Sequence, residues 1–193
     1  MSKGKIIFLN GASSSGKTVI AEALQDKLSE PYLTLSVDGF MDLFLQGYIS
    51  GAKGAELTPE DVQTLTALIP KIVSSFHQCI AVFADNGIHV IVDHVLQDPD
   101  WLKACVEALQ GFPVLFVGVR CPLEVLEKRE QEREREPGTA RKQFDIVHAH
   151  GVYDLEVDTS LQSPEEIAEL IAERESQISS AAAFKKLAEE LLV

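Results

Sequence analysis

The residues with the clearest chemical meaning form a phosphate-binding pattern near the N-terminus. Gly11, Gly16, Lys17 and Thr18 occupy the fixed positions of G-x-x-x-x-G-K-[ST]. In such a loop, backbone N–H groups and the start of the following helix surround phosphate oxygens. We expect Lys17 to reach the β- and γ-phosphates and the Thr18 hydroxyl to bind Mg²⁺. The predicted nucleotide-binding residues are Gly11, Ala12, Ser13, Ser14, Ser15, Gly16, Lys17 and Thr18.

Two aspartates follow apolar, β-rich segments and are expected near the same phosphates. Asp38 follows the run 33–37, and Asp93 ends the run 88–93. In an open α/β sheet, ligands bind at the carboxyl ends of the strands. Asp38 is predicted to orient an acceptor hydroxyl and take its proton, or else to cap the segment after it. Asp93 is predicted to hold Mg²⁺ or contact the acceptor, or else to bind nearby backbone.

Arginines gather in the charged segment 124–136, which is predicted to be helical. Arg129 and Arg133 share a helix face, and Arg135 lies just before Pro137. Guanidinium groups suit the negative charge that develops on the peripheral oxygens during phosphoryl transfer. The alternative is that these arginines only solvate the helix and pair with the six acids in the segment. Arg133 and Arg135 are the catalytic candidates.

A segment rich in large apolar side chains, residues 39–57, follows the second predicted strand. It is predicted to form either a helix packed under the core or a mobile apolar wall for an acceptor molecule, because ligand pockets are mostly apolar with few polar groups. In the second interpretation Phe40 and Phe44 bind the acceptor together with Asp38 and Asp93.

Strand and helix patterns alternate along the chain, which predicts a parallel sheet with right-handed crossovers. The expected strands are 5–9, 33–37, 88–93, 113–119 and 153–158. The expected helices are 19–28, 58–87, 99–110, 124–136, 140–149, 163–174 and 181–192. His148 and His150 would then lie on different faces of a helix, which argues against a metal site. We expect one three-layer α/β/α domain spanning residues 1–193.

Composition narrows the classes of partner. The formal charge of −13 over 193 residues disfavours nucleic acid, which attracts basic surfaces. The sequence has no run of 18 apolar residues, so no membrane span is expected. The N-terminal residues do not have the pattern of a signal peptide. Cys79, Cys105 and Cys121 are expected to be buried thiols in a reducing cytoplasm. The guanine-recognition motif N-K-x-D is absent, which favours a small kinase over a GTPase.

The sequence resembles the chloramphenicol phosphotransferase family over roughly residues 4–175. The resemblance lies in IIFLNGASSSGKT, LSVDGF, VIVDHV, FVGVRCPLEVLEKRE and KQFDIVHAHGVYDLEVDTS. It implies a fold like that of nucleotide and shikimate kinases, with five strands in the order 2-3-1-4-5. It also implies transfer of the γ-phosphate of ATP, with Mg²⁺, to the primary hydroxyl of the antibiotic, and hence antibiotic resistance.

The resemblance also assigns roles to single residues. Asp38 matches the general base, Arg133 and Arg135 match basic residues of a lid at about 124–142, and Thr159 and Ser160 would lie near the adenine. Three parts depart from the family pattern. His94 stands where members tend to carry a second acid, residues 39–57 match poorly, and a helix at about 179–192 lies beyond the match.

Two further functions stay open at this point. The acceptor could be a nucleoside or a central metabolite instead of an antibiotic, although Lys53 is the only basic residue in 39–57. The protein could also bind a nucleotide without catalysis, as a switch or partner-binding protein. In that case the C-terminal helix, FKKLAEELLV, would pack against a partner or a second copy in a homo-oligomer, although a terminal helix more commonly docks on its own domain.

Overall fold

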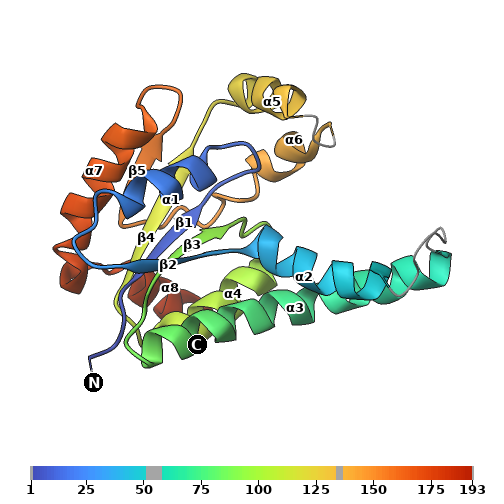
Figure 1. Cartoon of the computed structure of the whole chain (residues 1–193), viewed down its shortest axis with the longest axis horizontal. Helices are drawn as coiled ribbons and strands as arrows, with labels where there is room; N and C mark the ends of the chain where they lie inside the picture. Colours follow the sequence, from blue (N-terminus) through green and yellow to red (C-terminus); the bar gives the residue numbers. More distant parts are fainter. Residues whose placement is uncertain (1, 51–57, 134–136, 193) are drawn as a thin grey trace.

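A parallel five-stranded sheet lies between two layers of helices (Figure 1). The computed structural model describes residues 2–50, 58–133 and 137–192. The strands are β1 Ile6–Asn10, β2 Tyr32–Ser36, β3 His89–His94, β4 Val114–Arg120 and β5 Leu155–Asp158. The helices are α1 Lys17–Gln25, α2 Val37–Ser50, α3 Pro59–Asp85, α4 Pro99–Leu109, α5 Leu123–Glu132, α6 Thr139–Phe144, α7 Pro164–Glu175 and α8 Ala183–Leu191, with a 3₁₀ turn at Ile178–Ser180. The strand order β2-β3-β1-β4-β5 confirms the predicted order.

The central strand β1 is buried on both faces, so its sequence is apolar without alternation. Successive side chains of a strand point to opposite faces. Ile6 and Phe8 therefore pack into the core under α3, α4 and α8, and Ile7 and Leu9 pack into the core under α1 and α7. Figure 1 shows these two helical layers on either side of the sheet.

The register of the strands brings three functional segments to one edge. Leu9 of β1 and Ser36 of β2 both pair with Asp93 of β3, so the carboxyl ends of these strands align. The phosphate loop follows β1, and Asp38 comes two residues after β2. The edge expected to bind ligands therefore carries the phosphate loop and both aspartates.

The second strand ends earlier than its β-rich sequence predicts. The Ser36 hydroxyl accepts a 3.0 Å hydrogen bond from the Gly39 N–H, which is how a serine caps a helix N-terminus. Val37 and Asp38 therefore begin α2, and Asp38 lies in the first helical turn. Of the two interpretations of residues 39–57, helix is correct as far as Ser50, while residues 51–57 lie outside the described part of the chain.

Helix α3 starts at a capping box formed by Thr58 and Asp61 and continues through Pro70. It is long and apolar enough to cross a membrane by length and composition, with mean hydropathy 1.4 over 18 residues. A core helix of a soluble protein meets the same criteria. Phe76 and Ile80 of α3 are fully buried, but only 33% of the apolar window as a whole is buried, and a single helix of this kind is weak evidence for a membrane span.

The helix predicted at 140–149 is shorter than expected. α6 ends at Phe144, and a series of turns follows through His150. The prediction that His148 and His150 lie on a helix is therefore wrong, and both rings pack against Tyr153, with centroid distances of 5.6 and 4.7 Å. Among the residues that the structure describes, no three His, Cys, Asp or Glu side chains are grouped to hold a metal ion.

Candidate active site

The phosphate loop between β1 and α1 has the backbone conformation that its sequence implies. Ser14 and Gly16 have φ angles of 63° and 97°, in the left-handed region. Glycine reaches this region without strain, and a loop of this kind can present backbone N–H groups to an anion. Two of its N–H groups are used within the protein: Ser13 donates to Gln143 Oε1 and Ser15 donates to the Ala12 carbonyl. The loop closes directly onto α1, whose N-terminal N–H groups and positive dipole end also favour an anion. The residues predicted to bind a nucleotide form this loop, 11–16, and the first turn of α1, which contains Lys17 and Thr18.

Lys17 lies at the centre of the loop with 6% of its side chain exposed. Its Nζ donates to the carbonyls of Gly11 and Ala12 at 2.9 Å and lies 3.7 Å from Asp93. Burial lowers the pKa of the Lys17 amine, while the Asp93 and Asp38 carboxylates raise it. Both predicted aspartates are thus close enough to act on this ammonium group.

Thr18 and Asp93 form a pair of oxygen ligands beside the loop. The Thr18 hydroxyl donates a 2.7 Å hydrogen bond to Asp93 Oδ2. Mg²⁺ takes oxygen ligands and commonly keeps several waters besides one or two protein oxygens and the substrate phosphates. A hydroxyl and a carboxylate in contact at the edge of a phosphate loop therefore fit this ion. Asp93 faces the loop and does not line the cavity beside Asp38 that is described below.

A cavity of about 200 Å³ lies between the phosphate loop and α5. Its lining residues are Gly16, Val19, Ile20, Arg129, Arg133, Thr159, Gln162 and Pro164. The Arg129 guanidinium donates two hydrogen bonds of 2.9 Å to Thr159: Nη1 donates to the hydroxyl oxygen Oγ1, and Nη2 donates to the backbone carbonyl oxygen. Thr159 Oγ1 also donates to the Ser15 carbonyl at 2.8 Å. The geometry suits a nucleoside attached to phosphates held in the loop.

The sequence prediction for this cavity agrees with the structure only in part. Arg133 and Thr159 line the cavity, and Arg133 is close enough to lower the pKa of Lys17. Ser160 instead bonds Asp158 through its N–H and hydroxyl, at 2.8 and 2.6 Å, and does not line the cavity. Arg135 lies outside the described residues. Arg129, which the sequence analysis did not choose as a catalytic candidate, makes the two hydrogen bonds to Thr159 described above.

A second cavity, of about 400 Å³, opens beside Asp38. Its apolar wall comes from Val37, Met41, Ile69, Val73, Val95 and Trp101, and its polar groups are Asp38, Asp42, Gln97 and Gln143. The prediction that Phe40 and Phe44 bind an acceptor here disagrees with the lining. Because α2 is helical, residues 37, 38, 41 and 42 share the face toward the cavity. Phe40 packs instead on Phe44 and Phe76, at 5.1 and 5.2 Å.

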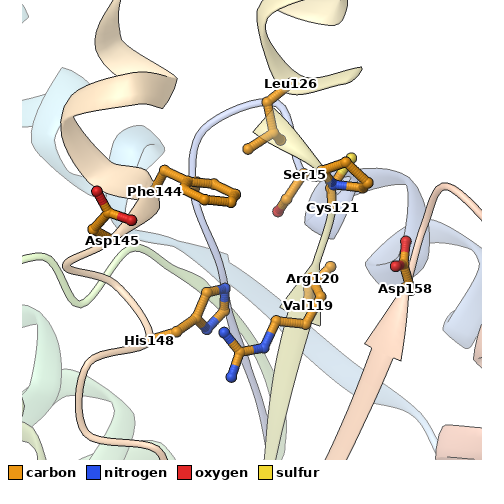
Figure 2. A pocket seen from close by; sticks show the side chains of 11 residues that line it. Ser15, Val119, Arg120, Cys121, Leu126, Phe144, Asp145, His148 and Asp158 are labelled. Atoms are coloured by element: carbon orange, nitrogen blue, oxygen red, sulfur yellow. The ribbon is translucent and has the colours of Figure 1, made fainter. Parts of the chain in front are cut away.

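A third cavity, also of about 400 Å³, lies on the other side of the phosphate loop, between β4 and the segment after α6 (Figure 2). Figure 2 shows the His148 ring and the Arg120 guanidinium pointing into the same space, with Phe144 and Asp145 above them. Burial, and next the charge of Arg120, lower the pKa of His148 to about 3. His148 is therefore neutral at physiological pH and bonds the Tyr153 hydroxyl at 2.6 Å.

The strand order and the phosphate loop between β1 and α1 define a P-loop kinase fold. Solved structures with this fold align closely. A sugar kinase from Janibacter sp. HTCC2649 has a TM-score of 0.63 and 23% identity, covering 91% of this chain and 95% of that one. The Mycobacterium tuberculosis APS kinase CysC, solved with AMPPNP and APS, has a TM-score of 0.62 and 17% identity, covering 90% of this chain and 98% of that one.

The chain belongs to the chloramphenicol phosphotransferase-like family, whose model matches residues 4–176. It is 29% identical over 205 residues to the Mycobacterium tuberculosis (strain ATCC 25618 / H37Rv) protein named "Putative O-phosphotransferase Rv2636", covering all of this chain and 91% of that protein. The family resemblance and the fold predicted from the sequence are thereby confirmed. The protein is a phosphotransferase of the kinase class, with a nucleotide site and a small-molecule acceptor that offers a hydroxyl group.

Proposed function

We propose that this protein transfers the γ-phosphate of ATP to a hydroxyl of an uncharged, partly apolar small molecule, with chloramphenicol as the first candidate. The observation that supports it most strongly is the composition of the cavity beside Asp38. Its described lining residues include two carboxylates and an apolar wall, and none is Lys, Arg or His. An anionic acceptor such as a nucleotide would meet like charge there and find no cation to pair with.

The roles of the residues follow from where they lie. The phosphate loop and Lys17 would hold the triphosphate, and Arg129 with Thr159 would form one wall of the nucleoside site. Thr18 and Asp93 would hold Mg²⁺, which neutralises charge on the phosphates when bound. Asp38 would accept the proton of the acceptor hydroxyl while that oxygen attacks the γ-phosphorus, and the bond from this phosphorus to the β–γ bridging oxygen would break as ADP leaves. Arg133 would stabilise charge on the peripheral oxygens of the transferred group.

The test is phosphoryl transfer from labelled ATP to a panel of acceptors that includes chloramphenicol, neutral alcohols, nucleosides and adenylyl sulfate. We expect transfer to chloramphenicol or another neutral alcohol and none to adenylyl sulfate, which is anionic. Asp38→Asn should lower kcat by about 10²-fold or more with ATP affinity retained, as expected for a general base. Asp42→Asn is the matched control, because Asp42 lines the same cavity one turn along α2.

Other outcomes of this screen are equally informative. Nucleotide binding without transfer to any alcohol would support a non-catalytic nucleotide-binding protein instead. Transfer to chloramphenicol predicts that expression of the gene raises the antibiotic concentration that cells tolerate. We also propose a cytoplasmic location, which is supported by the three cysteines, all free thiols.

A further inference from the structure

A chain of two side-chain carboxamides connects the phosphate loop to the acceptor cavity. Gln143 Oε1 accepts a 2.7 Å hydrogen bond from the Ser13 backbone N–H. Gln143 Nε2 donates a 2.9 Å hydrogen bond to Gln97 Oε1. A backbone N–H only donates, so the oxygen of Gln143 must face Ser13 and its nitrogen must face Gln97. The orientation of both carboxamides is therefore determined by the phosphate loop.

These contacts leave hydrogen-bond donors at the wall of the cavity. A carboxamide nitrogen carries two hydrogens, and only one hydrogen of Gln143 is used by Gln97. Neither hydrogen of Gln97 Nε2 bonds to a group in the described ranges 2–50, 58–133 and 137–192. Both glutamines are half-buried and line the same cavity as Asp38. The cavity thus offers amide donors and carboxylate acceptors on its polar side, and an apolar wall.

We propose that Gln143 positions both substrates: its oxygen holds the phosphate loop at Ser13, while its nitrogen, together with Gln97, donates hydrogen bonds to an oxygen of the acceptor. This inference rests on the proposed phosphotransferase function and adds to it a requirement on the acceptor. Besides the reacting hydroxyl at Asp38, the acceptor carries a carbonyl, nitro or ether oxygen that receives these amide hydrogens. Its apolar part packs on the wall that includes Trp101.

The two glutamines differ in one respect that an experiment can use. Gln143 contacts the phosphate loop directly, whereas Gln97 reaches it only through Gln143. Replacing Gln97 should therefore affect the acceptor alone. Replacing Gln143 should affect the acceptor and also leave the Ser13 N–H without its partner, which loosens a preorganised loop. A merely structural role for both residues would not separate the two substrates in this way.

The experiment compares Gln97→Leu, Gln143→Leu and, in case the second folds poorly, Gln143→Met. Gln63→Leu is the control, because Gln63 is exposed on α3 and lines neither the cavity beside Asp38 nor the cavity beside Arg129. For each protein, titration calorimetry gives the Kd for ADP, and steady-state kinetics give kcat and the acceptor KM. The acceptor is chloramphenicol or whichever neutral alcohol of the panel the wild type phosphorylates. Thermal unfolding of each variant verifies that it is folded.

Loss of one net hydrogen bond corresponds to a change of about 3- to 10-fold. We expect Gln97→Leu to raise the acceptor KM by about this factor with the ADP Kd unchanged within twofold. Gln143→Leu should raise both the acceptor KM and the ADP Kd. An acceptor KM unchanged in both variants, or an ADP Kd that responds equally to both, would overturn the proposal. Failure of the wild type to phosphorylate any acceptor would instead contradict the proposed function itself.

Discussion

Thr18 and Asp93 are joined by a 2.7 Å hydrogen bond although they are 75 positions apart in the sequence. Thr18 belongs to the first turn of α1, and Asp93 is the penultimate residue of β3. The contact places the hydroxyl that the sequence motif assigns to Mg²⁺ beside a carboxylate that was predicted to hold the same ion or to contact the acceptor. The other oxygen of the same carboxylate lies 3.7 Å from the Lys17 ammonium group. Asp93 therefore contacts both the lysine and the threonine of the phosphate-binding motif.

Asp93→Asn is expected to impair the use of Mg²⁺ more than the binding of nucleotide. A carboxamide oxygen is a weaker ligand for a hard cation than a carboxylate oxygen. The Mg²⁺ concentration for half-maximal activity should rise at least about tenfold, with metal-free ADP binding nearly unchanged. Kinetics at varied Mg²⁺ measure the effect. Asp98→Asn is the control because asparagine still caps α4. A Mg²⁺ dependence identical to wild type would remove Asp93 from this role.

Arg129→Lys is expected to weaken nucleotide binding. The guanidinium makes two hydrogen bonds to Thr159 in a fork that an ammonium group cannot reproduce. We expect the Kd for ATP analogues to rise by about tenfold, measured by calorimetry, with the acceptor KM little changed. Arg141→Lys provides the comparison, since Arg141 is exposed and pairs with Glu127 at the surface. Equal affinities for the two variants would show that the fork is dispensable.

Glu130→Gln is expected to destabilise the connection between α5 and α6. The buried Glu130 carboxylate accepts 2.8 Å hydrogen bonds from the N–H groups of Gly138 and Ala140, at the start of α6. Glutamine retains one acceptor oxygen and presents an NH₂ group to the other donor. Urea denaturation should show a loss of about 1–3 kcal/mol, the cost of an unsatisfied buried donor. Glu132→Gln, at an exposed position, should change stability by less than about 0.5 kcal/mol.

The buried His77–His94 pair predicts lower stability in mild acid. The ring nitrogens Nε2 lie 2.9 Å apart, and burial lowers the pKa of His77 to about 4 and that of His94 as well. As pH falls below 6.5, the ordinary pKa of a histidine, these side chains bind protons in the unfolded chain but stay neutral in the folded chain. The unfolding free energy should therefore fall between pH 6.5 and about 4, by up to about 1.4 kcal/mol per pH unit for each histidine.

Denaturant titrations at pH 7 and pH 5 measure this slope. His148 and His150, whose pKa values burial lowers to about 3 and about 4, act in the same direction. His77→Gln should reduce the slope, because it removes one of the four groups. His89→Gln serves as the control: that ring is only partly buried and accepts a hydrogen bond from the Lys5 N–H. A stability that is constant or rises toward pH 5 would contradict the prediction.

The sheet could be predicted from the sequence because its inner strands are buried on both faces and read as continuous apolar runs. β1 and β4 were recognisable in this way, and the loop after β1 by its motif. The start of α2 could not be placed, because the Ser36 cap overrides the β-propensity of the residues around it. The position at which α2 begins decides which of its side chains face the cavity. For this reason the sequence could not show that Met41 lines the cavity and Phe40 does not.

Other parts of the site depend on tertiary contacts that leave no local pattern. Gln143 reaches Ser13 across 130 positions, and no spacing in the sequence indicates this. Trp101 belongs to α4 and lines the cavity only because α4 packs beside α3. Arg129 was detectable through its four-residue spacing from Arg133, but its preference for Thr159 required the fold.

Helix α8 completes the core beneath the strand that carries the phosphate loop. Its Phe184 is 4% exposed and packs against Phe8 of β1 and Phe116 of β4, at 5.9 and 5.1 Å. During synthesis on the ribosome, these two strands emerge long before the helix that covers them. The nascent polypeptide therefore cannot finish packing around its first strand until residues 183–191 have left the exit tunnel.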